Sequence, residues 1–452
     1  MGIKKTRTAD MTSGPIMMQL IRFSLPLLLG NVFQMLYNTV DSLVVGNFVG
    51  TEALAAVGST TMIINILVLF FNGLAVGAGV LIGQLFGAQD KDTLHTAVET
   101  TMSMTFIFSV LFTIIGVAGV PLMLKLMSTP ADVMEPASLY LRIYFSGISG
   151  MLIYNMGGGI LRAVGDSIRP LEFLIFTSVM NTILDLFFVL GLHKGIAGVA
   201  IATVISQFCS ALLILRLLVR TDEIYYFRFS DLCLNLPLLG TIFRFGLPAA
   251  IQSTLTAFSN TFVQSYINTF GSSCMAGWSC YNKLDQFVFL PIVSMNMAAT
   301  AFVSQNIGAG QVKRANKGTG VALAMISVIT IAISSVLVLF AREASAIFTS
   351  DQAVIEFSVL FLSTNTMLLI FNSINHVLAG ALRGRGDSFG PMIIMVSTFV
   401  VIRQIYLFVV TRFFINTPKV VGFGYPIGWM SCCIIQLLYF YFRWLRPSKK
   451  EA

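Results

Sequence analysis

The sequence has few charged residues. Aspartate, glutamate, lysine and arginine together make up 11% of its 452 residues, whereas 56% of the residues are hydrophobic. A soluble domain carries roughly 25% charged residues, so the composition excludes an ordinary water-soluble protein and predicts a polytopic membrane protein. The formal net charge of +8 does not indicate a nucleic-acid partner, because no basic run alternates with aromatic residues.

The motifs of common enzymes and of ATP-driven proteins are missing as well. The sequence contains no GxxxxGK[ST] phosphate loop, no GxSxG nucleophile turn and no HExxH zinc motif. Its six cysteines include no CxxC pair, and its three histidines are scattered. We therefore expect neither an enzyme nor a cofactor, and an energy source other than ATP.

Long apolar runs are what the sequence does contain. A membrane span needs about 20 mostly apolar residues, and the chain offers twelve such runs. They lie at about 16–48, 53–83, 92–122, 136–161, 168–192, 196–220, 237–268, 275–305, 317–341, 354–382, 388–413 and 420–446. The prediction is an all-α membrane protein with twelve transmembrane helices.

The basic residues predict the orientation. If both termini are cytoplasmic, twenty lysines and arginines fall at the inner ends of the spans, including Lys4, Lys5 and Arg7 before the first span and Lys449 and Lys450 after the last. Seven fall at the outer ends. Cytoplasmic loops carry an excess of lysine and arginine, so we expect a multi-pass protein of the plasma (inner) membrane with both termini inside.

Three sequence segments occur twice in register. RFSLP at 22–26 returns as RFGLP at 244–248, GQLFGA at 83–88 as SQNIGA at 304–309, and LRAVGDSIRP at 161–170 as LRGRGDSFGP at 382–391. Six spans per half is an even number, so both halves enter the membrane in the same direction. Such parallel repeats form two bundles around a central cavity. We expect an N-terminal lobe at 1–220, a cytoplasmic connection at 221–236 and a C-terminal lobe at 237–452.

With its two halves of six spans and LRxxGDSxxP after spans four and ten, the chain resembles the multidrug and toxic compound extrusion family. The segment NTILDLFFVLGLHKGIAGVAIATVISQ at 181–207 supports the resemblance, which covers nearly the entire chain. It implies two pseudo-symmetric six-helix lobes and the export of amphiphilic, cationic drugs or toxic metabolites in exchange for H⁺ or Na⁺. The expected partners are these small molecules and membrane lipid, with the chain acting as a monomer.

Two other functions remain open. The same superfamily contains flippases for lipid-linked oligosaccharides, but a flippase cavity needs several arginines for a diphosphate, and few lie inside these spans. A membrane-embedded enzyme would need an acid pair facing its substrate, and the pair of Asp41 and Asp185 is all that the sequence offers.

Asp41 is an aspartate inside an apolar span, where an unpaired carboxylate costs several kcal/mol. It lies seven residues from the outer end of the first span, or about 10 Å at helical rise. Asp185 in span five has the same depth, and Thr203 in span six a comparable one. Asn181 is one turn from Asp185. Further polar side chains at similar depth are Gln34, Tyr37, Asn38 and, deeper, Asn155.

The resemblance assigns a role to these residues. Asp41, Asn181, Asp185 and Thr203 match, one by one, the cation site that one branch of the family has in its N-terminal lobe. Two nearby carboxylates in a low dielectric cannot both stay ionised without a cation, so the site would hold H⁺, or Na⁺ as a metal ligand set. Pro26 in the same span removes one backbone hydrogen bond, and we expect it to act as a hinge.

Charged residues also occur in the second half. Asp285 in span eight and Arg403 in span eleven are predicted to lie at similar depth and to form a charge pair, whereas the sequence assigns no role to Lys283 or His376. The RGD at 385–387 falls in a cytoplasmic loop, which excludes an adhesion motif. The aspartate or serine of each GDS is expected to cap the following helix.

Overall fold

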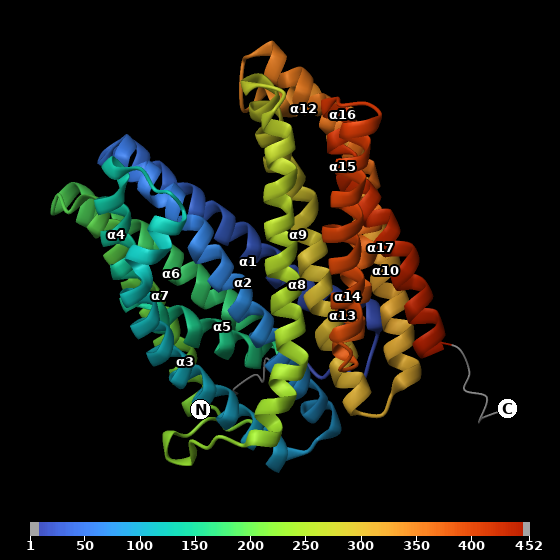
Figure 1. The fold of residues 1–452 in the computed structure, drawn as a ribbon. Helices are drawn as coiled ribbons and strands as arrows, with labels where there is room; N and C mark the ends of the chain where they lie inside the picture. Colours follow the sequence, from blue (N-terminus) through green and yellow to red (C-terminus); the bar gives the residue numbers. More distant parts are fainter. Residues whose placement is uncertain (1–8, 446–452) are drawn as a thin grey trace. The chain divides into compact units, whose positions relative to one another are not determined.

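The computed structural model describes residues 9–445, apart from the side chains at positions 51, 52 and 54, and its regular secondary structure in that range is entirely helical (Figure 1). The basic residues at 4, 5, 7, 446, 449 and 450, which contribute to the predicted orientation, lie outside the described residues. The all-α class predicted from the apolar runs is confirmed.

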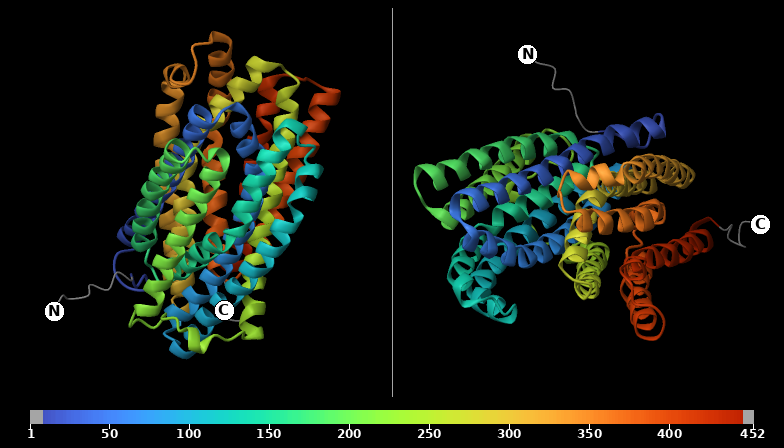
Figure 2. Two further views of the ribbon diagram at one scale, coloured as in Figure 1. Left: turned by 90° about the vertical axis from the view of Figure 1, so that its left-hand side faces the viewer. Right: turned by 90° about the horizontal axis from the view of Figure 1, so that it is seen from above.

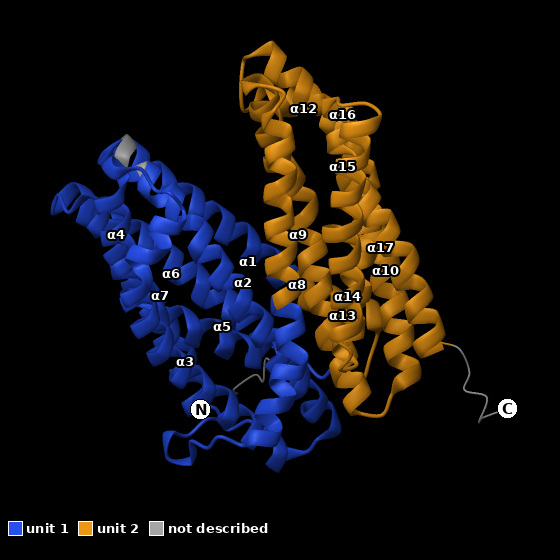
Figure 3. Cartoon of the chain, in the orientation of Figure 1, with its two compact units in different colours: residues 1–10, 25–250 blue, residues 11–24, 251–452 orange. Residues whose placement is uncertain are grey.

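The chain divides into two compact units (Figure 3). Unit 1 contains residues 25–250, and unit 2 contains residues from 251 onwards together with 11–24. The boundaries between the units therefore fall inside two long helices, between residues 24 and 25 and between residues 250 and 251. The expected boundary between the lobes was instead the connection at 221–236. The reason at 250 is close packing within unit 1, because a Cβ added to Gly73 would lie 2.4 Å from the Ala250 backbone and one added to Gly77 would lie 2.4 Å from Gly246.

The helices of unit 1 lie side by side (Figures 1 and 2). They are α1 (Ile16–Val44, whose first residues belong to unit 2), η1 (Val45–Val49), α2 (Thr51–Ala88), α3 (Lys91–Leu126), α4 (Ala131–Ser146), α5 (Ile148–Ala163), α6 (Ile168–Leu186), η2 (Phe187–Gly191), α7 (Gly195–Arg220) and the 3₁₀ turn η3 (Phe229–Asp231).

Unit 2 repeats this order with more interruptions. Its helices are α8 (Leu236–Asn268, whose first half belongs to unit 1), α9 (Ser272–Gly308), α10 (Val312–Leu339), α11 (Ala341–Ala346), α12 (Gln352–Asn365), η4 (Thr366–Leu368), α13 (Leu369–Gly384), α14 (Phe389–Val396), η5 (Ser397–Ile402), α15 (Arg403–Phe413), α16 (Pro418–Gly422), α17 (Gly424–Phe440) and η6 (Tyr441–Leu445).

Each of the twelve predicted spans coincides with one helix or with a run of consecutive helices. Among the described residues, ten helical stretches are long and apolar enough to cross a membrane. The predicted fourth and seventh spans, which correspond to α4–α5 and to α8, are helical too. Large apolar side chains on α3 also face outwards: Val110 is 62% exposed, Ile114 64% and Leu122 62%. Such a surface suits contact with lipid.

The fourth and tenth spans differ from the prediction, because each is interrupted. Gly147 separates α4 from α5, and the 3₁₀ turn η4 separates α12 from α13. A Cβ on Gly147 would lie 2.3 Å from the Val204 side chain, so this position packs directly against α7. The interruptions stand at corresponding places in the two halves, which supports the repeat.

The GDS loops have the predicted capping role in both halves, and the aspartates perform it. Asp166 Oδ1 accepts hydrogen bonds from the backbone N–H groups of Ile168 and Arg169, both at 3.1 Å. Asp387 Oδ1 accepts one from the N–H of Gly390 at 3.0 Å. The preceding glycines have φ angles of 87° and 84°, a region that favours glycine. Within residues 9–445, the side chains of the following serines make no capping hydrogen bond.

Candidate cation-binding site

Four polar residues in unit 1 converge from three helices. Asp41 comes from α1, Asn181 and Asp185 from α6, and Thr203 from α7. Asn181, Asp185 and Thr203 are buried, with 1%, 0% and 5% of their surfaces exposed, and Asp41 is half-buried. The carboxyl groups of Asp41 and Asp185 lie within hydrogen-bonding reach of each other. The four residues predicted to share one depth thus share one site.

Asn181 connects Asp185 to α7. With its carboxamide oriented so that both ends are satisfied, its NH₂ group donates to Asp185 Oδ2 at 2.9 Å, and its oxygen accepts from the backbone N–H of Thr203 at 3.2 Å. Asn181 and Asp185 are four residues apart and therefore neighbours on α6. The amide fixes the direction in which one oxygen of the Asp185 carboxyl group points.

The local backbone brings these helices together. A Cβ on Gly150 of α5 would lie 2.8 Å from the backbone of Gln207, so the lack of a side chain there allows α7 to approach α5. Just beyond the two aspartates, α1 and α6 pass into the π-helical turns η1 and η2, which lie against each other. Single π-helical turns are frequent at functional sites.

Each carboxyl group keeps one oxygen without a donor. Asp41 Oδ1 and Asp185 Oδ1 are buried and have no hydrogen-bond partner among the described residues. A buried carboxylate oxygen left in this way is costly unless a proton or a cation satisfies it. Two carboxyl groups, an amide and a hydroxyl are also the oxygen donors that a hard cation prefers. The site can therefore hold a proton between its carboxyl groups or a small monovalent cation.

Of the residues expected to support the site, Tyr37 reaches it. Its hydroxyl group hydrogen-bonds to the Thr203 side chain, and it lies close enough to Asp41 and Asp185 to interact with both electrostatically. The Thr203 hydroxyl itself donates to the Val199 carbonyl oxygen at 3.0 Å, so its lone pairs remain available as acceptors.

Gln34, Asn38 and Asn155 make other contacts. Gln34 and Asn38 are exposed, and the Gln34 amide donates to Asn38 at 3.4 Å. The Asn155 side chain donates to the Met151 carbonyl oxygen of its own helix at 2.9 Å. Among the contacts of the described residues, none joins these three side chains to the carboxyl pair.

Sequence reasoning overlooked three neighbours of the site. Tyr140 and Tyr144 of α4 stack with ring centroids 6.5 Å apart, and Tyr140 lies close enough to Asp41 to interact with it electrostatically. Gln207 Nε2 donates to the Tyr144 hydroxyl at 3.5 Å. The available signal was spacing: the two tyrosines are four residues apart inside a span, and Gln207 lies one turn after Thr203.

The predicted charge pair of unit 2 is wrong. Arg403 is buried, donates to the Ser259 hydroxyl at 2.6 Å and stacks on Tyr425 at 4.7 Å. Asp285 instead hydrogen-bonds to Tyr281 on its own helix, and within residues 9–445 no ion pair joins it to Arg403. The prediction failed because equal depth does not bring two helix faces together.

Two further polar residues of unit 2 contact aromatic rings. The Lys283 ammonium lies 5.5 Å from the Phe348 ring, and the His376 ring meets Phe289 edge-on at 5.2 Å. Within the part of the chain that the structure describes, no three His, Cys, Asp or Glu side chains come together as a metal site. The carboxyl pair of unit 1 thus stands out as the candidate site.

Comparison with known proteins agrees with the duplicated architecture. The MatE family model matches residues 26–187 and again 248–409, so the second match begins and ends 222 residues after the first. This separation confirms the internal repeat.

Relatives with similar sequences bear related names. The chain is 29% identical over 435 residues to the probable multidrug resistance protein YoeA of Bacillus subtilis (strain 168). The aligned residues cover 94% of each protein. It is 22% identical over 395 residues to the multidrug export protein MepA of Staphylococcus haemolyticus, with 87% of each covered.

Solved structures share the fold. A MATE transporter crystallised in complex with MaL6 superposes with a TM-score of 0.91 at 24% identity and covers 97% of this chain and 98% of its own. A multidrug resistance MATE family transporter in an outward-facing conformation gives a TM-score of 0.90 at 24% identity, with 98% of both chains covered.

Proposed function

The chain belongs to the MatE family of multidrug transporters, and on this premise we propose that it is a secondary active transporter coupled to H⁺ or Na⁺. The cation binds at Asp41 and Asp185 in unit 1 and moves inwards across the membrane, while an organic compound moves outwards. Asn181 and Thr203 complete the cation site.

The buried pair of carboxyl groups carries the proposal. Each of Asp41 and Asp185 has an oxygen to which no described residue donates, and both lie in helices of membrane-spanning length. Ionisable residues inside a membrane are expensive and are functional by default. If both carboxyl groups were ionised they would repel each other, so binding of one proton or cation is strongly favoured, and its release needs a change of conformation.

The proposed substrates are amphiphilic cations. The relatives that the chain resembles are named for multidrug resistance and multidrug export. The 38 phenylalanines and 22 methionines supply the adaptable apolar surface that such compounds need, because methionine side chains adjust to differently shaped ligands. We further propose that the protein acts as a monomer in the plasma (inner) membrane, with both termini cytoplasmic.

The proposed movement of the lobes uses two prolines. Pro26 stands next to the place where α1 passes from unit 2 to unit 1, and Pro248 stands close to the corresponding place in α8. Both residues lack the backbone N–H of a helical hydrogen bond, so the helix bends more easily there. Occupation of the cation site four turns further along α1 would favour one bend over the other.

A flux measurement tests this proposal. In liposomes containing the purified protein, an outward gradient of a fluorescent cationic dye should drive H⁺ or Na⁺ in the opposite direction. Imposing a pH jump and an Na⁺ jump in separate samples of one preparation identifies the ion. Dye movement without any ion flux would contradict the proposal, and movement of a lipid-linked oligosaccharide in place of the dye would favour the flippase.

A further inference from the structure

Arg385 is a buried arginine whose charge no acidic side chain balances among the described residues. It follows α13 directly and is 7% exposed. Its Nη2 atom donates to Asn316 Oδ1, and its guanidinium group lies 5.0 Å from the ring of Phe440 and 5.1 Å from that of Trp444. Nε and Nη1 are buried and have no hydrogen-bond partner within residues 9–445, although such donors are expensive to leave unsatisfied.

The neighbouring aspartate does not compensate for this charge. Asp387 Oδ1 caps α14 through the N–H of Gly390, and Asp387 Oδ2 accepts a hydrogen bond from the Tyr439 hydroxyl at 2.6 Å. Burial lowers the pKa of the Arg385 guanidinium to about 10, so it remains protonated at neutral pH. Nε and Nη1 of this protonated guanidinium group therefore have no acceptor among the described residues.

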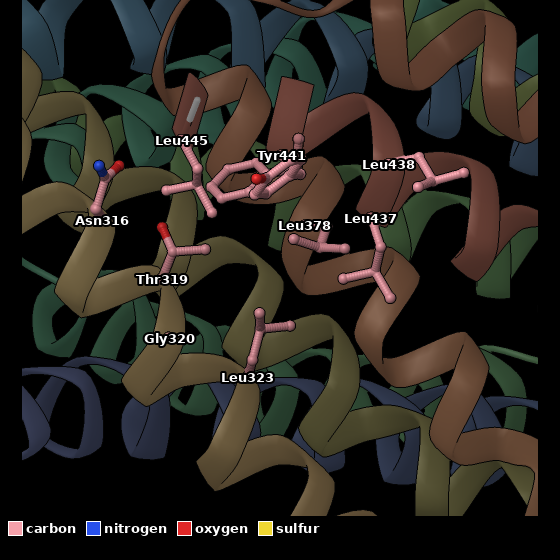
Figure 4. A pocket seen from close by; sticks show the side chains of 10 residues that line it. Asn316, Thr319, Gly320, Leu323, Leu378, Leu437, Leu438, Tyr441 and Leu445 are labelled. Atoms are coloured by element: carbon pink, nitrogen blue, oxygen red, sulfur yellow. The ribbon is translucent and has the colours of Figure 1, made fainter. Parts of the chain in front are cut away.

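A groove of about 430 Å³ (Figure 4) shares two lining residues with the surroundings of Arg385, which does not itself line it. Asn316 and Phe440, which contact the guanidinium group, both line it. Its walls are otherwise mostly leucines from α10, α13, α17 and η6, namely Leu323, Leu378, Leu437, Leu438 and Leu445. Leu438 and Tyr441 are each 52% exposed, so the groove opens onto an apolar outer surface.

The repeat shows that Arg385 is not needed to build its loop. The corresponding residue of the first half is Val164, in LRAVGDS where the second half has LRGRGDS. The glycine with positive φ and the capping aspartate are present in both loops. Arg385 therefore has a role specific to the second half, other than building this loop.

We propose that this groove binds one anionic phospholipid, whose acyl chain lies along the leucines and whose phosphate accepts hydrogen bonds from Arg385 once the ring of Phe440 or Trp444, which contacts the guanidinium group, has moved aside. Guanidinium and phosphate groups form strong charge-assisted hydrogen bonds. Arg385, the start of α10 and the end of η6 all lie at the ends of membrane spans, where headgroups are found. Arg443, 5.9 Å from the Trp444 ring, adds positive charge, and basic pockets between membrane helices bind anionic headgroups.

Native mass spectrometry of the full-length protein in detergent tests the proposal. We expect one phosphatidylglycerol to bind about tenfold more tightly than phosphatidylcholine with the same acyl chains, and Arg385→Val to remove this preference. Arg342→Val is the matched control, because Arg342 is an exposed arginine of α11. Equal binding of the two lipids by the wild type, or an unchanged preference in Arg385→Val, would overturn the proposal.

A second variant blocks the groove and leaves Arg385 in place. Gly320 lines the groove, and a Cβ there would meet no atom of the described residues within 4 Å, so Gly320→Leu should fold, fill the groove and lose the bound phosphatidylglycerol. Gly240→Leu in α8, where a Cβ also meets nothing, should retain it. Retention by Gly320→Leu contradicts the proposal. So does displacement of the lipid by millimolar inorganic phosphate, since a site for small anions needs no acyl chain.

Discussion

The guanidinium group of Arg314 donates to the main-chain oxygen of Met11, with 3.3 Å between Nη2 and that oxygen. The same nitrogen donates to the carbonyl oxygens of Ser13 at 3.0 Å and Gly14 at 2.9 Å. Met11 is buried, and its N–H donates to Gln305 Oε1 at 2.9 Å. The segment before α1 is thus bound to the adjoining ends of α9 and α10, which explains why residues 11–24 belong to unit 2.

The first prediction follows from this contact. Arg314→Gln should release the segment from unit 2, because one side chain supplies donors to three carbonyl groups there. Backbone amides of residues 11–19 should exchange with deuterium at least about tenfold faster, corresponding to the roughly 1.5–3 kcal/mol of a charged hydrogen bond. The neighbouring Lys313→Gln is the control, since Lys313 is exposed. Asn306 Nδ2 also donates to the Met11 carbonyl oxygen, at 3.1 Å. Unchanged exchange in Arg314→Gln would show that the hydrogen bonds of Gln305 and Asn306 to Met11 suffice to hold the segment.

The second prediction concerns the proposed cation site. Asp41→Asn preserves the volume of the side chain and removes its titratable charge, so ion-coupled export should fall to the rate of protein-free liposomes. The variant should still be purified as a folded protein, as judged by gel filtration and by its melting temperature. Export at the wild-type rate by well-folded Asp41→Asn would exclude Asp41 from the coupling mechanism.

The third prediction tests whether the residues act on one ion. Asp185→Asn and Asn181→Ala should each weaken ion coupling, the second less strongly, because Asn181 orients Asp185 through its NH₂ group. Losses at groups that share one ligand do not add. Asn181→Ala/Asp185→Asn should therefore transport no more slowly than Asp185→Asn alone. If this double variant loses the product of both effects, the two residues act independently and not on one ion.

The fourth prediction concerns stability. A Cβ at Gly77 would lie 2.4 Å from Gly246 Cα and 2.6 Å from the Ile242 carbonyl oxygen, so Gly77→Ala should lower the stability by about 1–3 kcal/mol through overpacking. Gly58→Ala in the same helix is the control, because a Cβ there meets no atom of the described side chains or backbone within 4 Å. The melting temperature in detergent should fall for the first variant and stay equal or rise slightly for the second.

Glycine spacing is one of the features that the sequence predicts well. Gly73 and Gly77 of α2 have the GxxxG spacing that is typical of close helix packing, and they are where α8 approaches. The membrane spans and the internal repeat can be predicted from the sequence equally well, because each depends on a pattern that extends over many residues of long helices. Asp41 and Asp185 have the expected equal depth, but that they come together could be expected only from the family resemblance, which makes the first, fifth and sixth spans neighbours.

Depth alone does not give the direction in which a side chain points. Tyr37 and Asn38 are adjacent in the sequence, yet Tyr37 contacts Thr203 whereas Asn38 pairs with Gln34. Arg403 has the depth of a partner for Asp285 but faces Ser259 and Tyr425. Which helix face meets which neighbour is decided by packing across the whole bundle, and the spacing of polar residues along one helix does not contain that information.

The fifth prediction concerns the hinge proposed at Pro26. Protonation of the carboxyl pair, or Na⁺ binding to it, should change the bend of α1 and move its outer half relative to α6. Spin labels on the outer halves of these two helices should therefore give different distance distributions at low and high pH, or with and without Na⁺. The shift requires that the two conformations differ in their affinity for the ion by a few kcal/mol.

Variants at the two prolines make this prediction specific. Pro26→Ala restores a backbone N–H to α1 and should leave one distance population at every pH and Na⁺ concentration. Pro248→Ala changes the corresponding proline of α8 and should leave the α1–α6 distances responsive, because both helices carrying the labels belong to unit 1 beyond residue 24. A single, unchanging distance in wild-type protein that transports its substrate would rule out the hinge. An ion response that persists in Pro26→Ala would mean that α1 bends elsewhere.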